Sequence, residues 1–249
     1  MGKTDHTTLA GKRILVTGGT TGIGRATVKM LVEEGARVLT FGRHRQELDD
    51  ALENARGGPG EVSGLTADSS SREGVRKVFA ALDERLGGID MLVCCAALGA
   101  GPLHESEEEE WRYVIETNLL GYIACAWHAI KRMEQNGGGH LLFVGSISST
   151  IKAAGESVYS ATKAGIDAFA ETLRKEISDE KNIKISVIQP GSVGTDMQEC
   201  TIEQQREAIA NHQMLYAEEL AEAILFALTR SERADVVTLR IEPRVQKTS

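Results

Sequence analysis

The pentapeptide from Tyr159 to Lys163, YSATK, holds two side chains whose types and spacing fit proton chemistry. A tyrosine and a lysine four residues apart lie on one face of a helix, about one turn from each other. An ammonium beside a phenol favours the phenolate, so the pair predicts a Tyr159 pKa below the ordinary value of about 10. A phenol tuned in this way can give or take a proton at working pH. The alternative is a surface pair without function, because the spacing also arises by chance on amphipathic helices.

A glycine-rich turn near the N-terminus indicates a nucleotide site. The β-branched run RILVT, from Arg13 to Thr17, reads as a buried strand and enters GGTTGIG, from Gly18 to Gly24. A helical pattern follows and ends at Gly35, and a second strand is expected from Arg37 to Phe41. Glycines permit a close backbone approach, and a helix N-terminus offers unpaired N–H groups to an anion. This strand, turn, helix and strand therefore predict dinucleotide binding.

Three residues that follow the second and third expected strands bear on how a nucleotide would be bound. Gly42 stands where an NAD-preferring site usually carries an acid, and the guanidinium of Arg43 can hold a 2′-phosphate, so NADP is favoured over NAD. The alternative for Arg43 is a solvated basic loop. Asp68 either caps the next helix or accepts a hydrogen bond from an adenine amino group.

The remaining chain alternates strands with helices. Apolar, β-branched runs predict seven strands at Arg13 to Thr17, Arg37 to Phe41, Glu61 to Leu65, Asp90 to Cys94, His140 to Gly145, Ile183 to Ile188 and Asp235 to Ile241. Helices are expected between them, including runs from about Glu107 to Gln135 and from Glu156 to Asp179. This alternation predicts an α/β, Rossmann-type fold: a doubly wound parallel sheet in three layers. With no repeat, linker or composition shift, residues 1–249 are expected to form one domain.

Composition limits the partners. The formal net charge of -8, without a basic stripe, argues against nucleic acid, and no apolar run is long enough for a membrane span. The N-terminus has no signal-peptide core, and the four cysteines form no disulfide or zinc pattern. We therefore expect a cytoplasmic protein with reduced thiols and no metal site.

Taken together, these motifs resemble the short-chain dehydrogenase/reductase family over nearly the whole chain. The matching segments are TGGTTGIG at Thr17 to Gly24, Asn118 in the mid-chain helix, Ser146 with twelve residues between it and Tyr159, YSATK, and PGSVGT from Pro190 to Thr195. The C-terminal segment is similar, less specifically, to a subgroup of 3-hydroxy acid, serine and clavulanate-type dehydrogenases.

The resemblance implies a role for each matched residue. Tyr159 would be the general acid in carbonyl reduction and the general base in alcohol oxidation. Lys163 would lower the pKa of Tyr159 and hold the nicotinamide ribose. Ser146 would bind the substrate oxygen, and Asn118 would fix a water that links Lys163 to solvent. The expected cofactor contacts are Gly18, Thr20, Thr21, Gly22, Ile23, Gly24, Arg43, Asp68, Ser69, Cys95, Ala96, Tyr159, Lys163, Gly191, Val193 and Thr195.

One segment departs from the family pattern. Cys94-Cys95-Ala96-Ala97 stands where most members have Asn-Asn-Ala-Gly, and cysteine cannot repeat the hydrogen bonds of asparagine. This puts in doubt the local sheet bonding and the contact with the adenine ribose. It leaves the proton chemistry unaffected.

The sequence thus favours an NADP-dependent oxidoreductase that interconverts a secondary alcohol and a ketone on a small polar substrate. The polar segment from about Met197 to Met214, with Glu199, Glu203, Arg206 and Glu207, would be the substrate lid. One alternative is a 3-oxoacyl thioester reductase, and another is a non-catalytic nicotinamide-nucleotide sensor. Apolar residues on several faces of the two long helices, among them Trp127, Ile130, Phe169 and Leu173, predict a homodimer or homotetramer, as in the family.

Overall fold

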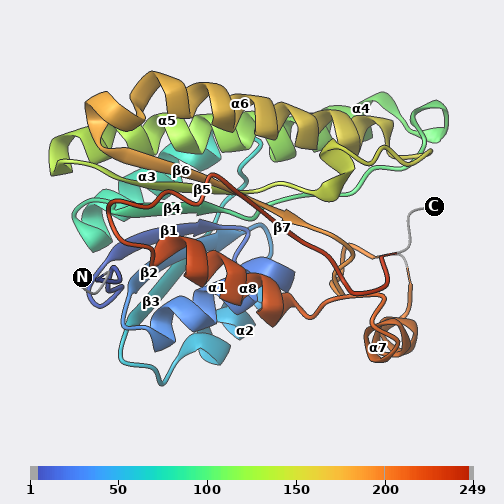
Figure 1. Ribbon diagram of the computed structural model, residues 1–249, viewed down its shortest axis with the longest axis horizontal. Coiled ribbons are helices and arrows are strands. Elements are labelled where there is room, and N and C mark those ends of the chain that lie inside the picture. Colours follow the sequence, from blue (N-terminus) through green and yellow to red (C-terminus); the bar gives the residue numbers. More distant parts are fainter. Residues whose placement is uncertain (1–4, 199, 247–249) are drawn as a thin grey trace.

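Seven parallel strands form the central layer of the computed structural model, which describes residues 5–198 and 200–246 (Figure 1). The strands are β1 (Arg13–Thr17), β2 (Arg37–Gly42), β3 (Glu61–Thr66), β4 (Met91–Cys94), β5 (Gly139–Val144), β6 (Ile183–Pro190) and β7 (Thr238–Ile241). Their order is β3-β2-β1-β4-β5-β6-β7, so the direction of winding reverses between β1 and β4. Ligands of open parallel sheets bind beyond the carboxyl ends of the strands at such a reversal.

Helices cover both faces of the sheet, which confirms the three-layered, doubly wound fold (Figure 1). The α-helices are α1 (Gly22–Glu33), α2 (Arg45–Ala55), α3 (Arg72–Leu86), α4 (Glu108–Ile115), α5 (Gly121–Met133), α6 (Ser157–Lys181), α7 (Ile202–Ala210) and α8 (Ala217–Leu228). The shorter helical segments are η1 (Leu103–Glu105), η2 (Glu116–Leu120), η3 (Glu134–Asn136) and η4 (Ile147–Ser149). Figure 1 shows α3 to α6 along one face and α1, α2 and α8 along the other.

Each face of the sheet has its own apolar core because successive residues of a strand point to opposite sides. In β1, Leu15 joins the cluster beneath α3, α5 and α6, whereas Ile14 and Val16 join the cluster beneath α1 and α8. The inner strands β1, β4 and β5 are apolar almost throughout because both of their faces are covered, whereas the edge strands β3 and β7 are mostly half-buried or exposed. Within the described residues, no helix combines the length and apolarity that a bilayer crossing requires.

Two elements differ from the sequence expectations. The helix expected without interruption from Glu107 to Gln135 contains a π-helical turn at η2, which carries Asn118. The last strand begins at Thr238 rather than Asp235. It is an edge strand that pairs only with β6 among the described strands, and the first residue pair between the two is Val187 with Thr238. The other strands match their expected positions within two residues.

Candidate active site

The turn between β1 and α1 has the tight geometry that the glycines predict. Gly18 and Gly22 have φ values of +64° and +49°, which glycine adopts without strain. A Cβ atom on Gly18 would lie 2.6 Å from the Cα of Ala96, and one on Gly24 would lie 2.1 Å from the carbonyl oxygen of Gly18. Thr21 is the N-cap of α1, but its side chain accepts no hydrogen bond from the helix. The N–H groups of the first helical turn are therefore available to bind an anion. The turn therefore fits a nucleotide pyrophosphate.

A cavity of about 590 Å³ lies beyond the carboxyl ends of β1 to β4 and brings most of the expected cofactor residues together. Twelve of them line it: Gly18, Thr20, Thr21, Gly22, Ile23, Gly24, Arg43, Asp68, Ser69, Cys95, Ala96 and Thr195. The other four lie nearby but differently placed. Gly191 and Tyr159 line a second cavity, Val193 is buried in a bridge to Leu215, and Lys163 is buried between the sheet and α6.

Tyr113 of α4 joins the two residues expected to contact adenosine. Its hydroxyl donates to Oδ2 of Asp68 at 2.6 Å and accepts from Nη1 of Arg43 at 2.9 Å. Burial raises the pKa of Asp68, but the hydrogen bonds from Tyr113 and Ser70 outweigh burial, so the pKa lies below its ordinary value. Sequence reasoning missed Tyr113, because no local pattern marks a tyrosine 45 residues from its partner.

Asp68 does not cap the helix that follows it. Of the two alternatives for Asp68, capping is therefore wrong: Ser71 is the N-cap of α3, and its hydroxyl accepts from the N–H of Gly74 at 2.9 Å. Asp68 instead accepts from the backbone N–H of Ser70 at 2.9 Å. Its carboxylate thus faces the cavity in a fixed orientation.

Ser146 and Tyr159 lie together in a second cavity of about 820 Å³. Ser146 follows β5, and its Oγ accepts from the N–H of Ser148 at 3.1 Å. Tyr159 lies in the first turn of α6, with its phenol near the Ser146 side chain. The two cavities share Gly99 and Met197 in their walls, so a group bound in one is adjacent to a group bound in the other.

Lys163 is 1% exposed, and its Nζ donates to the carbonyl oxygen of Val144 at 2.9 Å. Burial lowers the pKa of Lys163 to about 8. The Nζ atom lies 5.5 Å from the ring centroid of Tyr159. The expected fall in the Tyr159 pKa does not occur in the chain alone: burial raises it, the hydrogen bond with Ser146 opposes burial, and the charge of Glu156 adds to the rise.

Asn118 anchors the loop that follows β4. The side chain is fully buried; Oδ1 accepts from the N–H of Leu98 at 2.8 Å, and Nδ2 donates to the carbonyl of Leu98 at 2.8 Å. This loop forms one wall of the first cavity. The sequence did not indicate the anchoring role, and the water link to Lys163 stays a prediction.

Thr17 ties the backbone of the Cys94-Cys95-Ala96-Ala97 segment to β1 without using the cysteine side chains. Its Oγ1 accepts from the N–H groups of Cys95 and Ala96, each at 3.1 Å, so the end of β4 remains tied to β1. Burial raises the pKa of Cys95 to about 12 and that of Cys94 well above its ordinary value. Both thiols therefore stay protonated, which disfavours a redox role.

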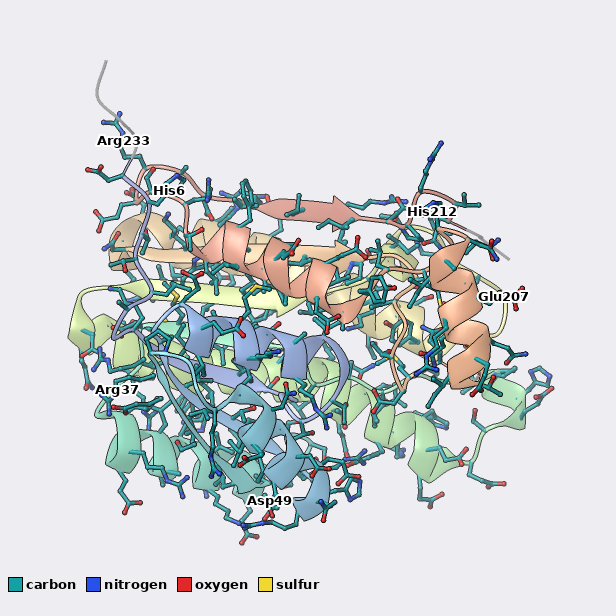
Figure 2. All side chains as sticks on the ribbon, turned by 90° about the horizontal axis from the view of Figure 1, so that it is seen from below. His6, Arg37, Asp49, Glu207, His212 and Arg233 are labelled. Atoms are coloured by element: carbon teal, nitrogen blue, oxygen red, sulfur yellow. The ribbon has the colours of Figure 1, made fainter. Side chains whose placement is uncertain are left out.

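The lid differs from its expected polar character on the side that faces the second cavity. Met197, Gln198, Cys200 and Met214 line that cavity, and the described charged lid residues do not belong to its wall. Glu207 of α7 points away from the body of the molecule in Figure 2. Glu199 lies outside the described residues.

Comparison with known proteins supports an oxidoreductase. The family model described as short chain dehydrogenase matches residues 12–206. The chain is 36% identical over 192 residues to the 3-oxoacyl-[acyl-carrier-protein] reductase FabG of Chlamydia pneumoniae, covering 76% of this chain and 77% of that protein. It is 35% identical over 185 residues to carbonyl reductase family member 4 of Danio rerio, covering 74% and 76%.

A solved structure agrees with these matches. An actinorhodin polyketide ketoreductase with NADPH superposes with a TM-score of 0.84 at 27% identity, covering 94% of this chain and 96% of that one. A short-chain type dehydrogenase/reductase from Mycobacterium ulcerans has the same TM-score at 22% identity and covers 95% and 90%, which shows a shared fold.

Proposed function

The chain belongs to the short-chain dehydrogenase family, and from that premise we propose an NADP-dependent oxidoreductase that interconverts a secondary alcohol and a ketone on a small polar substrate. The main support is that Ser146 and Tyr159 line one cavity and that this cavity adjoins the one lined by the glycine-rich turn. A bound nicotinamide coenzyme supplies the hydride in reduction and accepts it in oxidation. A cytoplasmic location is part of the proposal, supported by the four free cysteines.

The protein residues handle the proton and the charge. In reduction, Tyr159 gives its phenolic proton to the carbonyl oxygen as the carbon gains a hydride; in oxidation, the phenolate takes the hydroxyl proton. Ser146 hydrogen-bonds the substrate oxygen and stabilises its developing charge. Protonated Lys163 would stabilise the phenolate and would help to hold the nicotinamide ribose.

Two alternatives remain testable. The identity to FabG favours a 3-oxoacyl thioester as substrate, with the same chemistry. A panel of small ketones, their alcohols and a 3-oxoacyl thioester, each assayed with NADPH and NADH or their oxidised forms, separates these substrates. NADPH binding with no turnover of any compound would instead indicate a nucleotide sensor.

Replacing Arg43 with aspartate should raise the KM for NADPH by about 10- to 100-fold and shift the preference towards NADH. The change removes a charge-assisted contact and adds repulsion toward a 2′-phosphate. Arg45→Asp makes the same charge change outside the cavity, where Arg45 pairs with Asp49, and should leave both KM values unchanged. A wild type that already prefers NADH in steady-state kinetics would contradict the assignment.

We also propose a homodimer or homotetramer built on the α4–η2–α5 face. Its exposed apolar residues are Ile115, Leu120 and Trp127, with 36%, 53% and 58% exposure. Of the side chains expected to face outward, Ile130, Phe169 and Leu173 pack instead on the core.

Sedimentation equilibrium at micromolar concentration should therefore give a dimer or tetramer, and Trp127→Glu should shift it towards smaller species. Ile202→Glu changes an apolar residue of α7 with 64% exposure and should have no effect. A monomeric wild type would rule out the assembly.

A further inference from the structure

Among the described residues that line the second cavity, Glu156 is the charged one. The described residues that line this cavity are otherwise uncharged: glycine, alanine, serine, methionine, glutamine, cysteine, isoleucine, proline and the phenol of Tyr159. Lys152, the nearest basic residue in sequence, is not part of the described wall, and its Nζ donates to the carbonyl of Ser149. A substrate that enters therefore meets one carboxylate and no described cationic side chain.

The carboxylate is held close to the reacting position. Oε2 of Glu156 accepts from the hydroxyl of Ser148 at 3.1 Å, and the N–H of Ser148 in turn donates to Oγ of Ser146. Glu156 is the N-cap of α6, three residues before Tyr159, and its carbonyl accepts the first helical hydrogen bond, from the N–H of Ser160 at 2.7 Å. Residues with this spacing have Cβ atoms about 5–6 Å apart. The negative charge also acts on Tyr159, whose pKa it helps to raise.

We propose that Glu156 selects substrates with an ammonium group two or three bonds from the reacting carbon, namely small amino alcohols and amino ketones, and disfavours carboxylates. A half-buried carboxylate is stabilised by a cationic partner that replaces the water contacts it has lost. A substrate carboxylate would instead meet like charge, with no cationic side chain among the described residues of the wall. The inference rests on the proposed alcohol–ketone chemistry. The proposed substrates are cationic, unlike the anionic hydroxy acids of the 3-hydroxy acid dehydrogenases that the C-terminal segment resembles.

Three alcohols of similar size test the selection: 1-amino-2-propanol, 1,2-propanediol and 3-hydroxybutyrate, each oxidised with NADP⁺ to its ketone. In each case the carbinol hydrogen leaves as hydride to NADP⁺ and the hydroxyl proton goes to Tyr159. For the wild type, kcat/KM for the amino alcohol should exceed that for 3-hydroxybutyrate by about 100-fold or more.

The isosteric variant Glu156→Gln isolates the charge. It can still accept from Ser148, and the ratio of kcat/KM for the amino alcohol to that for the diol should fall at least about tenfold. Glu105→Gln removes an exposed carboxylate outside the cavity wall and should leave the ratio as in the wild type.

Two results would overturn the selection while leaving the alcohol chemistry intact: a wild type that oxidises the diol or the hydroxy acid at least as well as the amino alcohol, or a preference that persists in Glu156→Gln. If the wild type oxidises none of these alcohols or the wider panel, the proposed function fails. Calorimetric binding of 1-amino-2-propanol and 3-hydroxybutyrate to the wild type and Glu156→Gln then tests the charge preference by itself. Equal affinities of the wild type for the amino alcohol and the hydroxy acid would refute the charge preference.

Discussion

Tyr159→Phe should lower kcat by two or more orders of magnitude, about the contribution of a positioned general acid or base. Phenylalanine keeps the ring and its packing but removes the hydroxyl that lies near Ser146 in the cavity. NADPH binding should change little, because most residues of that site line the other cavity. The measurement is kcat for carbonyl reduction with a variant shown to bind NADPH normally.

Tyr122→Phe is a matched control. Tyr122 is buried, donates its hydroxyl to the carbonyl of Val144 at 3.3 Å, and has its ring centroid 5.6 Å from Nζ of Lys163. It lies outside the walls of both cavities, so its loss of kcat should be far smaller. Activity of Tyr159→Phe within about tenfold of the wild type would mean that another residue moves the proton.

Local geometry explains why much of the site was predictable. The turn at Gly18 to Gly24 needs glycine for the positive φ of Gly18 and Gly22 and for the contact of Gly24 with the carbonyl of Gly18, both of which are local features. Ser146 follows β5 and Tyr159 begins the next long helix, so their approach follows from the order of the elements. The apolar strands likewise indicate a sheet covered on both faces.

Properties set by packing were not predictable in the same way. Tyr113 meets Arg43, 70 residues away, only because the fold brings α4 near the residue that follows β2. The spacing of Tyr159 and Lys163 predicted that the two side chains lie close together. It did not reveal that the Tyr159 phenol is buried, and burial raises the pKa of Tyr159 instead of letting it fall. The three-residue spacing of Glu156 and Tyr159 was visible in the sequence, whereas the contact with Ser148 needed the turn at η4.

Lys163→Met should lower kcat further than Tyr159→Phe, by about three orders of magnitude, and should raise the KM for NADPH by about tenfold. The change removes both the cation that stabilises a phenolate and a proposed ribose contact. Because the pKa of Lys163 is about 8, wild-type carbonyl reduction should decline above about pH 8 as this cation loses its proton. The residual activity of Lys163→Met should not show that decline.

The same substitution should make the folded chain more stable. Burial lowers the pKa of Lys163 from 10.5 to about 8, so keeping its charge inside costs on the order of 3 kcal/mol below pH 8. Loss of the hydrogen bond to the Val144 carbonyl offsets about 1 kcal/mol of this stabilisation. Lys163→Met should therefore raise the free energy of unfolding by about 2 kcal/mol at pH 7.

The gain should shrink as pH rises from 8 towards 10.5, because the folded wild type then holds a neutral lysine while the unfolded chain still binds the proton. Urea unfolding of both proteins at pH 7 and at pH 10 measures the difference. A variant less stable than the wild type at pH 7 would show that the buried ammonium is compensated by its surroundings. An inactive but stabilised variant would show that the site keeps this charge for its chemistry at the expense of stability.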